Sequence, residues 1–126
     1  MVSCIVVDDD LDIVDLFCEL LEISNVQVLA KGHDGKQAVE LYEKFKPDVI
    51  FVDLSMPKFN GQYAITKIRR IHPDAKIILL TGDSGSESDL RETLDVDHVL
   101  HKPFNMRSIR EFITVALLDS AVSKNK

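Results

Sequence analysis

Short runs of apolar residues alternate along the chain with longer segments in which apolar residues recur every three or four positions. The runs are typical of strands buried on both faces, and the spaced residues are typical of amphipathic helices. The runs predict five strands, at 4–7, 26–30, 49–53, 77–81 and 96–100. The spaced residues predict five helices, with apolar stripes at 13–21, 38–45, 64–71, 90–94 and 109–117.

Strict alternation of strands and helices predicts an α/β fold in which right-handed crossovers join parallel strands and helices cover both faces of the sheet. We expect the (βα)5 flavodoxin-like three-layer sandwich, a doubly wound five-stranded sheet with the strand order 2-1-3-4-5. The 126 residues are enough for one such domain. We place this domain at residues 1–122 and expect a loose tail at 123–126.

Polar residues stand where four of the predicted strands end. Asp8 and Asp9 follow the first strand, Asp53 ends the third, Thr81 ends the fourth, and Lys102 follows the fifth. In the expected strand order the winding reverses between the first and third strands, and ligands bind outside the carboxyl ends of the strands at such a point. The topology therefore predicts one crevice that gathers residues distant in the sequence.

The predicted crevice holds three carboxylates, and each pair at 4 Å repels by roughly 4 kcal/mol if the effective dielectric constant is about 20. A cation must relieve this repulsion, and a few oxygen ligands open to water suit Mg²⁺. Together with the Lys102 ammonium and the Thr81 hydroxyl, these groups are what an aspartate needs to accept a phosphoryl group. Helix capping is the competing explanation for the acids, and it accounts for Asp10 but not for the convergence on Asp53.

Composition narrows the function further. The formal net charge of −6 argues against direct nucleic-acid binding, which needs a concentrated basic face, and the basic residues at 67–70 are predicted to lie on a solvated helix face. Cys4 and Cys18 lack the spacing of a redox or zinc site, so we expect buried free thiols. No segment is long and apolar enough to span a bilayer, and the N-terminus lacks the pattern of a signal peptide. We expect a cytoplasmic protein without membrane insertion.

These residues give the chain a family resemblance. It resembles, over nearly its whole length, the receiver domain of two-component response regulators, the CheY-like family. The resemblance rests on Val7-Asp8-Asp9, on Asp53 followed by Met56-Pro57 and Gly61, on Thr81-Gly82, and on Lys102-Pro103-Phe104. Each motif alone is weak, but in this order and spacing they are highly specific.

The resemblance implies a Mg²⁺-dependent reaction in which Asp53 accepts a phosphoryl group from the phosphohistidine of a sensor histidine kinase or a phosphotransfer protein. It implies that Asp9 binds the metal directly and that Asp8 acts largely through a bound water. Asp53 would add a carboxylate oxygen and Ser55 its main-chain carbonyl. By the same resemblance, the protein catalyses only its own phosphotransfer and slow dephosphorylation and is not an enzyme in the ordinary sense.

The resemblance also implies a switch. Lys102 would pair with the carboxylate and then with the phosphoryl group, and the Lys102-Pro103 bond would be cis. Thr81 would move inward to bond the phosphoryl oxygens, and the surface formed by the fourth helix, fifth strand and fifth helix would be remodelled.

The sequence departs from the family pattern near that surface. Val99 stands where receivers usually carry an aromatic residue, three positions before the lysine, and residues 94–97 lack the common Gly-Ala pair. We therefore expect an unusual coupling of phosphorylation to output. His98 and His101 differ by three positions, so on a regular strand they face opposite sides and would not share a metal site.

Three functions stay open. The first is a stand-alone receiver that signals to an unidentified partner protein, as a monomer or as a weak dimer through Val115, Leu118 and Val122. The second is a non-phosphorylated pseudo-receiver that acts only as a protein-interaction module and need not bind Mg²⁺. The third is a phosphohydrolase of the haloacid dehalogenase type, which also forms an aspartyl phosphate but wants an acid where this chain has Ser55.

Overall fold

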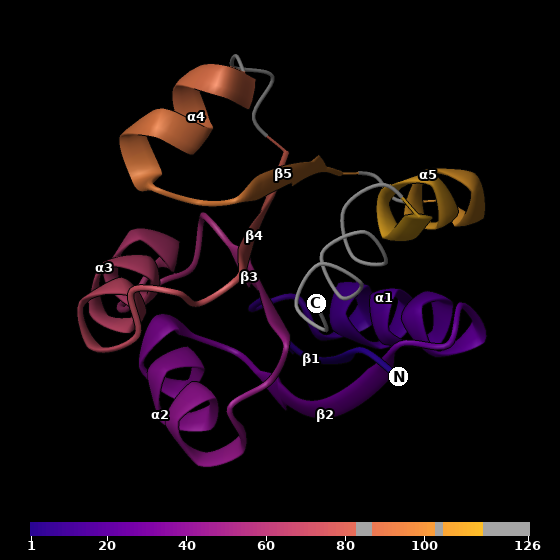
Figure 1. Ribbon diagram of the computed structural model, residues 1–126, viewed down its shortest axis with the longest axis horizontal. Coiled ribbons are helices and arrows are strands. Elements are labelled where there is room, and N and C mark those ends of the chain that lie inside the picture. The colour runs from indigo at the N-terminus through magenta and orange to yellow at the C-terminus, as the bar shows by residue number, and fades with distance from the viewer. Residues whose placement is uncertain (83–86, 103–104, 115–126) are drawn as a thin grey trace.

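The computed structural model describes residues 1–82, 87–102 and 105–114, and in it strands and helices alternate along the chain (Figure 1). The elements are β1 (Ser3–Val7), α1 (Leu11–Ile23), β2 (Gln27–Gly32), α2 (Gly35–Phe45), β3 (Val49–Asp53), α3 (Gly61–Ile71), β4 (Ile77–Thr81), α4 (Glu87–Leu94), β5 (His98–His101) and α5 (Met106–Phe112). The predicted tail at 123–126, the Lys102-Pro103 bond and the outward residues Val115, Leu118 and Val122 lie outside the described residues.

The five strands form one parallel sheet with the order β2-β1-β3-β4-β5. This confirms the predicted fold class and the reversal of winding between β1 and β3. The register pairs Val7 of β1 with Val52 of β3, so Asp8 and Asp53 follow at the same edge of the sheet. On the far side of β3, Asp53 pairs with Leu80, the residue before Thr81.

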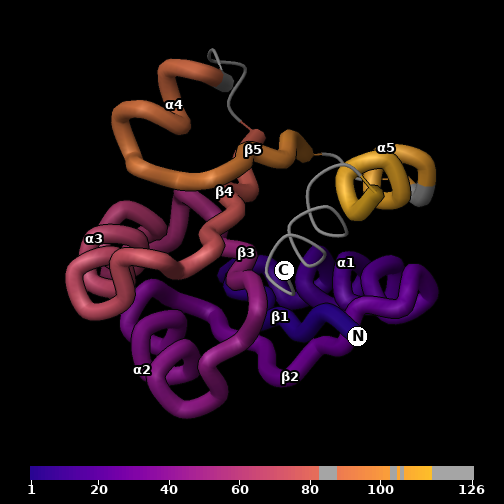
Figure 2. The backbone as a smooth tube through the Cα atoms, in the orientation of Figure 1, coloured from indigo at the N-terminus to yellow at the C-terminus, as the bar shows by residue number. Residues whose placement is uncertain are grey.

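Helices cover both faces of the sheet, with α1 and α5 on one side and α2 and α3 on the other (Figure 2). Successive side chains of a strand point to opposite faces, so Val6 packs in the core under α1 and α5 whereas Ile5 packs in the core under α2 and α3. In the first core the rings of Phe17 and Phe51 meet edge to face, with centroids 5.0 Å apart. The two cores bury β3 and β4 along their whole length and hold the carboxyl ends of these strands in fixed positions.

Most helices begin earlier than their apolar stripes, because a polar residue caps each start. The Asp10 carboxylate accepts hydrogen bonds from the backbone N–H groups of Asp12 and Ile13, at 3.1 and 3.2 Å. Asp34, Asn60 and Asn105 cap α2, α3 and α5 in the same way. Capping thus explains Asp10, as expected, and leaves Asp8 and Asp9 available for another purpose.

Some boundaries and burial assignments differ from the prediction. The second strand continues to Gly32, because that residue still pairs with Val7 of β1. The fifth strand begins at His98 and not at 96, since the preceding loop turns at Asp95, which has φ 56°. Leu16 was placed in an apolar stripe but its side chain is 51% exposed, because α1 packs through Val14 and other residues of the adjacent face.

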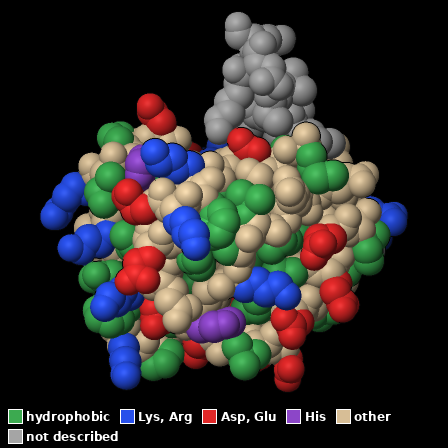
Figure 3. All heavy atoms as spheres, turned by 90° about the horizontal axis from the view of Figure 1, so that it is seen from below, with side chains coloured by type: hydrophobic (Ala, Val, Ile, Leu, Met, Phe, Trp, Pro, Cys, Tyr) green, Lys and Arg blue, Asp and Glu red, His purple; other side chains and the backbone are tan. Residues whose placement is uncertain are grey.

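The burial of the cysteines and the placement of the charged side chains mostly follow the prediction. Cys4 and Cys18 are buried free thiols, and burial raises the pKa of each. Lys, Arg, Asp and Glu side chains are intermingled on the face seen in Figure 3. Arg69, however, is only 18% exposed, so the prediction of a solvated face was wrong for that residue. None of the helices within the described ranges has both the length and the apolar character needed to cross a membrane.

Candidate functional site: an acidic crevice at the carboxyl edge of the sheet

The carboxyl ends of four neighbouring strands build the candidate site. Asp8 follows β1, Asp53 is the last residue of β3, and Thr81 is the last residue of β4. Lys102 follows β5 at once, and its backbone N–H donates to the Thr81 carbonyl at 2.8 Å. The parallel register therefore delivers four chemically active side chains to one edge, as the topology predicts.

Three carboxylates form the centre of this site. An oxygen of Asp8, an oxygen of Asp9 and an oxygen of Asp53 all lie within 4.8 Å of one another. Asp8 is fully buried and Asp53 is 5% exposed, whereas Asp9 is open to solvent. The cluster therefore has two buried carboxylates and one carboxylate that is accessible to solvent.

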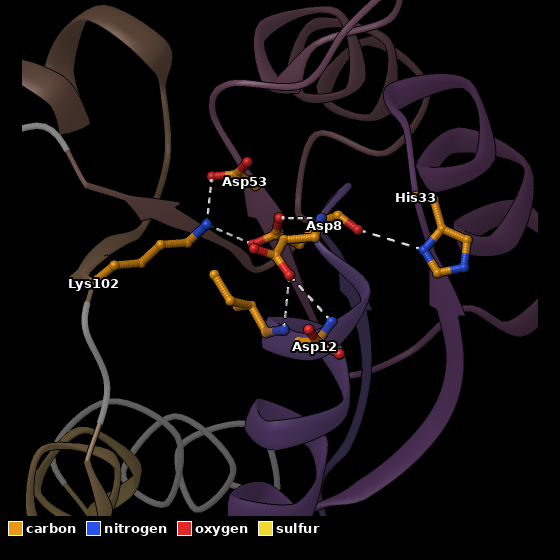
Figure 4. A network of polar contacts seen from close by, with 7 residues as sticks. Asp8, Asp12, His33, Asp53 and Lys102 are labelled. Carbon is orange, nitrogen blue, oxygen red and sulfur yellow. Dashed lines mark hydrogen bonds and ion pairs between the residues drawn. The ribbon is translucent and has the colours of Figure 1, made fainter.

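One cation contacts this cluster, as Figure 4 shows. The Lys102 ammonium nitrogen lies 2.6 Å from Oδ2 of Asp8 and 3.2 Å from Oδ1 of Asp53. The family resemblance implies pairing with Asp53, and the structure adds a shorter contact with Asp8. The other oxygen of Asp8 accepts a hydrogen bond from the backbone N–H of Asp10 at 3.0 Å. Asp8 therefore anchors both the lysine and the start of the β1–α1 loop.

The electrostatics of the cluster are unbalanced. Burial, together with the charge of Asp8, raises the pKa of Asp53 to about 6, even though the Lys102 ammonium opposes the shift. Burial alone would lower the pKa of Lys102, but hydrogen bonds with Asp8 and the charge of Asp53 outweigh it and raise that pKa. Three carboxyl groups thus lie beside the single ammonium that contacts the cluster in the described part of the chain.

The donor set fits Mg²⁺. The cluster offers only oxygen ligands, carries excess negative charge and is open to water at Asp9, and Mg²⁺ prefers a few carboxylates while it keeps several waters. Ser55 lies two residues beyond Asp53 in an exposed loop and lines an open groove with Leu54 and Asn60. Its expected role as a carbonyl ligand stays a prediction.

The two glycines beside the site differ in how closely other atoms surround them. A Cβ on Gly61 would lie 2.4 Å from the Asp53 carbonyl oxygen, so only glycine lets α3 start this close to the end of β3. A Cβ on Gly82 would meet nothing within 4 Å among the described residues, so packing does not require glycine at that position. The segment 83–86, which includes Asp83, lies outside the described residues.

His33 also reaches the site, although it is not among the residues that the sequence singled out. Its ring nitrogen Nδ1 lies 3.4 Å from the main-chain carbonyl oxygen of Asp8, and Figure 4 shows the ring directed at that atom. The strand expected at 26–30 ends three residues before His33, and only the extension of β2 to Gly32 brings His33 to the carboxyl edge of the sheet. The contact places the β2–α2 loop against the base of the carboxylate cluster.

The residues near the expected output surface are placed as follows. Val99 is 6% exposed and packs in the core under α2 and α3. The ring of His98 meets Phe112 of α5 edge on, with centroids 5.8 Å apart, whereas His101 is exposed. Ring rotation is not open to Val99, so the expectation of an unusual coupling keeps its physical basis.

Residues 4–114 match the response regulator receiver domain family, and the chain belongs to that family. It is a receiver domain of a response regulator in two-component signalling. Phosphorylation on aspartate and Mg²⁺ binding at an acidic pocket are characteristic of this family, whose members are signalling proteins. They interact with histidine kinases or phosphotransfer proteins and with downstream targets.

Individual relatives agree with this assignment. The transcriptional regulatory protein CpxR of Escherichia coli K12 is 38% identical over 111 residues, which are 86% of this chain and 46% of CpxR. The chain therefore spans less than half the length of that relative. Among solved structures, the receiver domain of AraT from Geobacillus stearothermophilus is 30% identical, with a TM-score of 0.86 over 99% of this chain and 98% of that one. TrrA from Thermotoga maritima, solved in complex with Mg²⁺ and BeF, is 31% identical, with a TM-score of 0.79 over 90% of this chain and 97% of that one.

Proposed function

We propose that Asp53 is a phosphoacceptor, which takes its phosphoryl group from a phosphohistidine on a histidine kinase or phosphotransfer protein in a Mg²⁺-dependent reaction. One observation carries this proposal: three carboxylates lie within 4.8 Å of one another, with the Lys102 ammonium in contact with two of them. A cluster that needed only structural neutrality would match its charges, and this one leaves negative charge in excess. This excess of negative charge favours the binding of Mg²⁺, which in turn can bind the oxygens of a phosphoryl group.

In the proposed reaction, an oxygen of the Asp53 carboxylate attacks phosphorus in line with the bond to the donor imidazole. The new O–P bond forms as the P–N bond breaks, and the electron pair of that bond stays on the imidazole nitrogen, which takes up a proton. A carboxyl with a pKa of about 6 is mostly ionised at neutral pH, so the nucleophile is ready without a general base.

The neighbouring side chains have distinct proposed roles. Asp9, Asp8, Asp53 and the Ser55 carbonyl would hold Mg²⁺, which supplies charge neutralisation for the phosphoryl oxygens when bound. The Lys102 ammonium is already 3.2 Å from Asp53 and would move its contact to a phosphoryl oxygen. The Thr81 hydroxyl would donate to another of these oxygens, since Thr81 ends the strand beside β3.

We further propose that phosphorylation changes the surface of α4, β5 and α5. A phosphoryl group adds about 1.5 to 2 negative charges and three acceptor oxygens, and these draw Thr81 toward Asp53. A shift of the active state from 1% to 99% of the population needs about 5.5 kcal/mol of differential stabilisation. A partner that binds only the active surface would contribute part of this free energy. Val99 contributes by packing and backbone position, because it has no ring to rotate.

The proposal is tested by incubating the chain with Mg²⁺ and acetyl phosphate and measuring its intact mass. The wild type should gain one phosphoryl group, Asp53→Asn should gain none, and the exposed-loop control Asp74→Asn should behave as the wild type. No gain in the wild type, or an equal gain in Asp53→Asn, would overturn the proposal. Mg²⁺ titration separates it from the pseudo-receiver, which need not bind the metal and which no specific observation favours.

Several finer expectations stay predictions. They are the stand-alone arrangement, the domain boundary at residue 122, the cytoplasmic location, and the monomeric or weakly dimeric state. The relative CpxR is matched over only 46% of its length, so output through a further domain and output through a separate protein are both compatible with the family. Size-exclusion chromatography with light scattering measures the oligomeric state.

A further inference from the structure

Two open grooves lie next to each other along α3, away from the acidic crevice. One, of about 280 Å³, runs between α3 and the end of α4, and the other, of about 320 Å³, runs along the outer side of α3. Gln62, Thr66 and Arg70 line both grooves, so the two form one band. Figure 2 shows α3 between α2 and α4 on the side of the sheet opposite α1.

This band is basic in an acidic protein. The chain has a formal net charge of −6, yet α3 contains three basic residues and no acidic one. The positive charge of Arg69 is already paired, because its guanidinium forms ion pairs with Asp95 and Asp97. Lys67 and Arg70 are exposed and form no ion pair among the residues that the structure describes. Two uncompensated cations therefore face solvent on one helix.

The side chains beside these cations are of the kinds that protein interfaces favour. Tyr63 is half-buried, its ring lies 4.9 Å from that of Phe59, and the Lys67 ammonium sits 5.7 Å over it. Interfaces are enriched in tyrosine and arginine. Tyrosine gives a large contact area at a low cost in conformational entropy, and arginine gives a charged group with several hydrogen-bond donors. Ile65 and Leu94 give the groove between α3 and α4 an apolar floor.

The band is continuous with a groove along the β3–α3 loop. Asn60 lines the outer groove of α3 and, in addition, the groove that contains Ser55 and Pro57 of the β3–α3 loop. That loop begins directly after Asp53, the proposed phosphoacceptor. A partner bound to α3 would therefore also contact the loop that follows Asp53.

We propose that Gln62, Tyr63, Thr66, Lys67 and Arg70, which we call the α3 surface, dock an acidic segment of a partner protein. Its carboxylates pair with the two free cations, and an apolar residue enters the groove over Ile65 and Leu94. Nucleic acid fits less well, because its affinity comes from many phosphate contacts and the α3 surface offers two free cations. A second copy of this chain fits less well because each copy carries a charge of −6. The proposal does not depend on phosphorylation of Asp53.

The test uses a fluorescein-labelled peptide of glutamate with leucine at every third or fourth position, followed by fluorescence anisotropy. The double variant Lys67→Glu/Arg70→Glu should weaken binding by at least about tenfold, since two attractions become repulsions. Thr66→Trp should weaken it as well, because it fills both grooves without a change of charge. The matched control Lys36→Glu/Lys44→Glu, on exposed positions of α2, should bind within about twofold of the wild type.

Circular dichroism melts establish that each variant is folded before binding is compared. The proposal is overturned if the peptide does not bind, if the α2 control loses as much affinity as the α3 double variant, or if Thr66→Trp has no effect. It is also overturned if a single-stranded oligonucleotide binds more tightly through the same residues. Self-association of the chain alone that depends on Lys67 and Arg70, measured by sedimentation, would assign the surface to a second copy instead.

Discussion

Two clusters of one cation with aspartates lie at opposite ends of the sheet, and they are built differently. At the carboxyl edge, Lys102 contacts Asp8 and Asp53, with Asp9 close by. At the amino edge, Arg69 contacts Asp95 and Asp97. The first cluster sets three carboxylates, two of them buried, against one ammonium. The second sets two carboxylates that are partly or largely exposed to solvent against a guanidinium that also donates to carbonyl oxygens.

The amino-edge cluster fixes backbone. The Arg69 guanidinium donates to the carbonyl oxygens of Pro73, Ala75 and Asp95, at 3.0, 2.6 and 2.9 Å, and to Oδ2 of Asp97 at 3.2 Å. Asp97 in turn accepts a hydrogen bond from the backbone N–H of Ile77 at 2.8 Å. The guanidinium fork suits such a task because its donors are rigidly arranged. Arg69 thus holds the loop in which Asp95 has a left-handed backbone conformation.

Both clusters have more carboxylates than cations, so burial of the excess negative charge separates the reactive cluster from the structural one. Removing a residue from the hydrogen-bonded Arg69 cluster should lower the stability of the fold. Neutralising a buried carboxylate of the Lys102 cluster should raise the stability and abolish the function.

The largest expected effect is on Arg69. Arg69→Met leaves three carbonyl oxygens and the Asp97 carboxylate without their donor, so the free energy of unfolding should fall by about 2 to 3 kcal/mol. Urea unfolding followed by circular dichroism measures this. The neighbouring exposed Arg70→Met is the control and should stay within about 0.5 kcal/mol of the wild type. Equal stability of the two variants would show that the hydrogen bonds of Arg69 do not stabilise this part of the fold.

Asp97→Ala should have the next largest effect. It removes a carboxylate that accepts from both Arg69 and the N–H of Ile77, so the free energy of unfolding should fall by about 2 kcal/mol. The double variant with Arg69→Met should lose less than the sum of the two single variants, because both cut one network. Additive losses in a double-mutant cycle would show that the two residues act separately.

Mg²⁺ affinity should depend on pH. The pKa of Asp53 is raised to about 6, so protons compete with the metal below that pH. The dissociation constant should rise by about tenfold, or about 1.4 kcal/mol, for each pH unit below about 6 and level off above it. Calorimetric titration from pH about 5 to about 8 measures this. A constant affinity across that range would place the metal away from Asp53.

Asp53→Asn should raise the stability of the metal-free chain. Because the pKa of Asp53 is higher in the folded state than its ordinary value of 3.8, the folded chain holds its proton more tightly, and stability falls as pH rises from about 4 to about 6. The variant lacks this loss and should be more stable above pH 6 by about 1 kcal/mol. Thermal melts in chelator at pH about 4 and about 7 test this, since the gain should appear only at the higher pH.

The sequence predicted the parts of the fold that depend on local pattern. The strand order could be inferred because five apolar runs alternate with helical stripes, and the convergence of Asp8 and Asp53 follows from that order. The Arg69 cluster could not be inferred, since its partners lie 26 and 28 residues away and include carbonyl oxygens that any residue would offer. Likewise, the exposure of Leu16 depends on the rotation of α1, which packing sets.

The central claim is that Asp53 takes up a phosphoryl group in a cluster that also binds Mg²⁺. Its most direct test is borohydride reduction after incubation with acetyl phosphate and Mg²⁺, which converts an aspartyl phosphate to homoserine, followed by peptide mapping. We expect homoserine at position 53 alone, and none when Mg²⁺ is chelated. Homoserine at another aspartate, or an equal yield at position 53 in the presence of chelator, would contradict it.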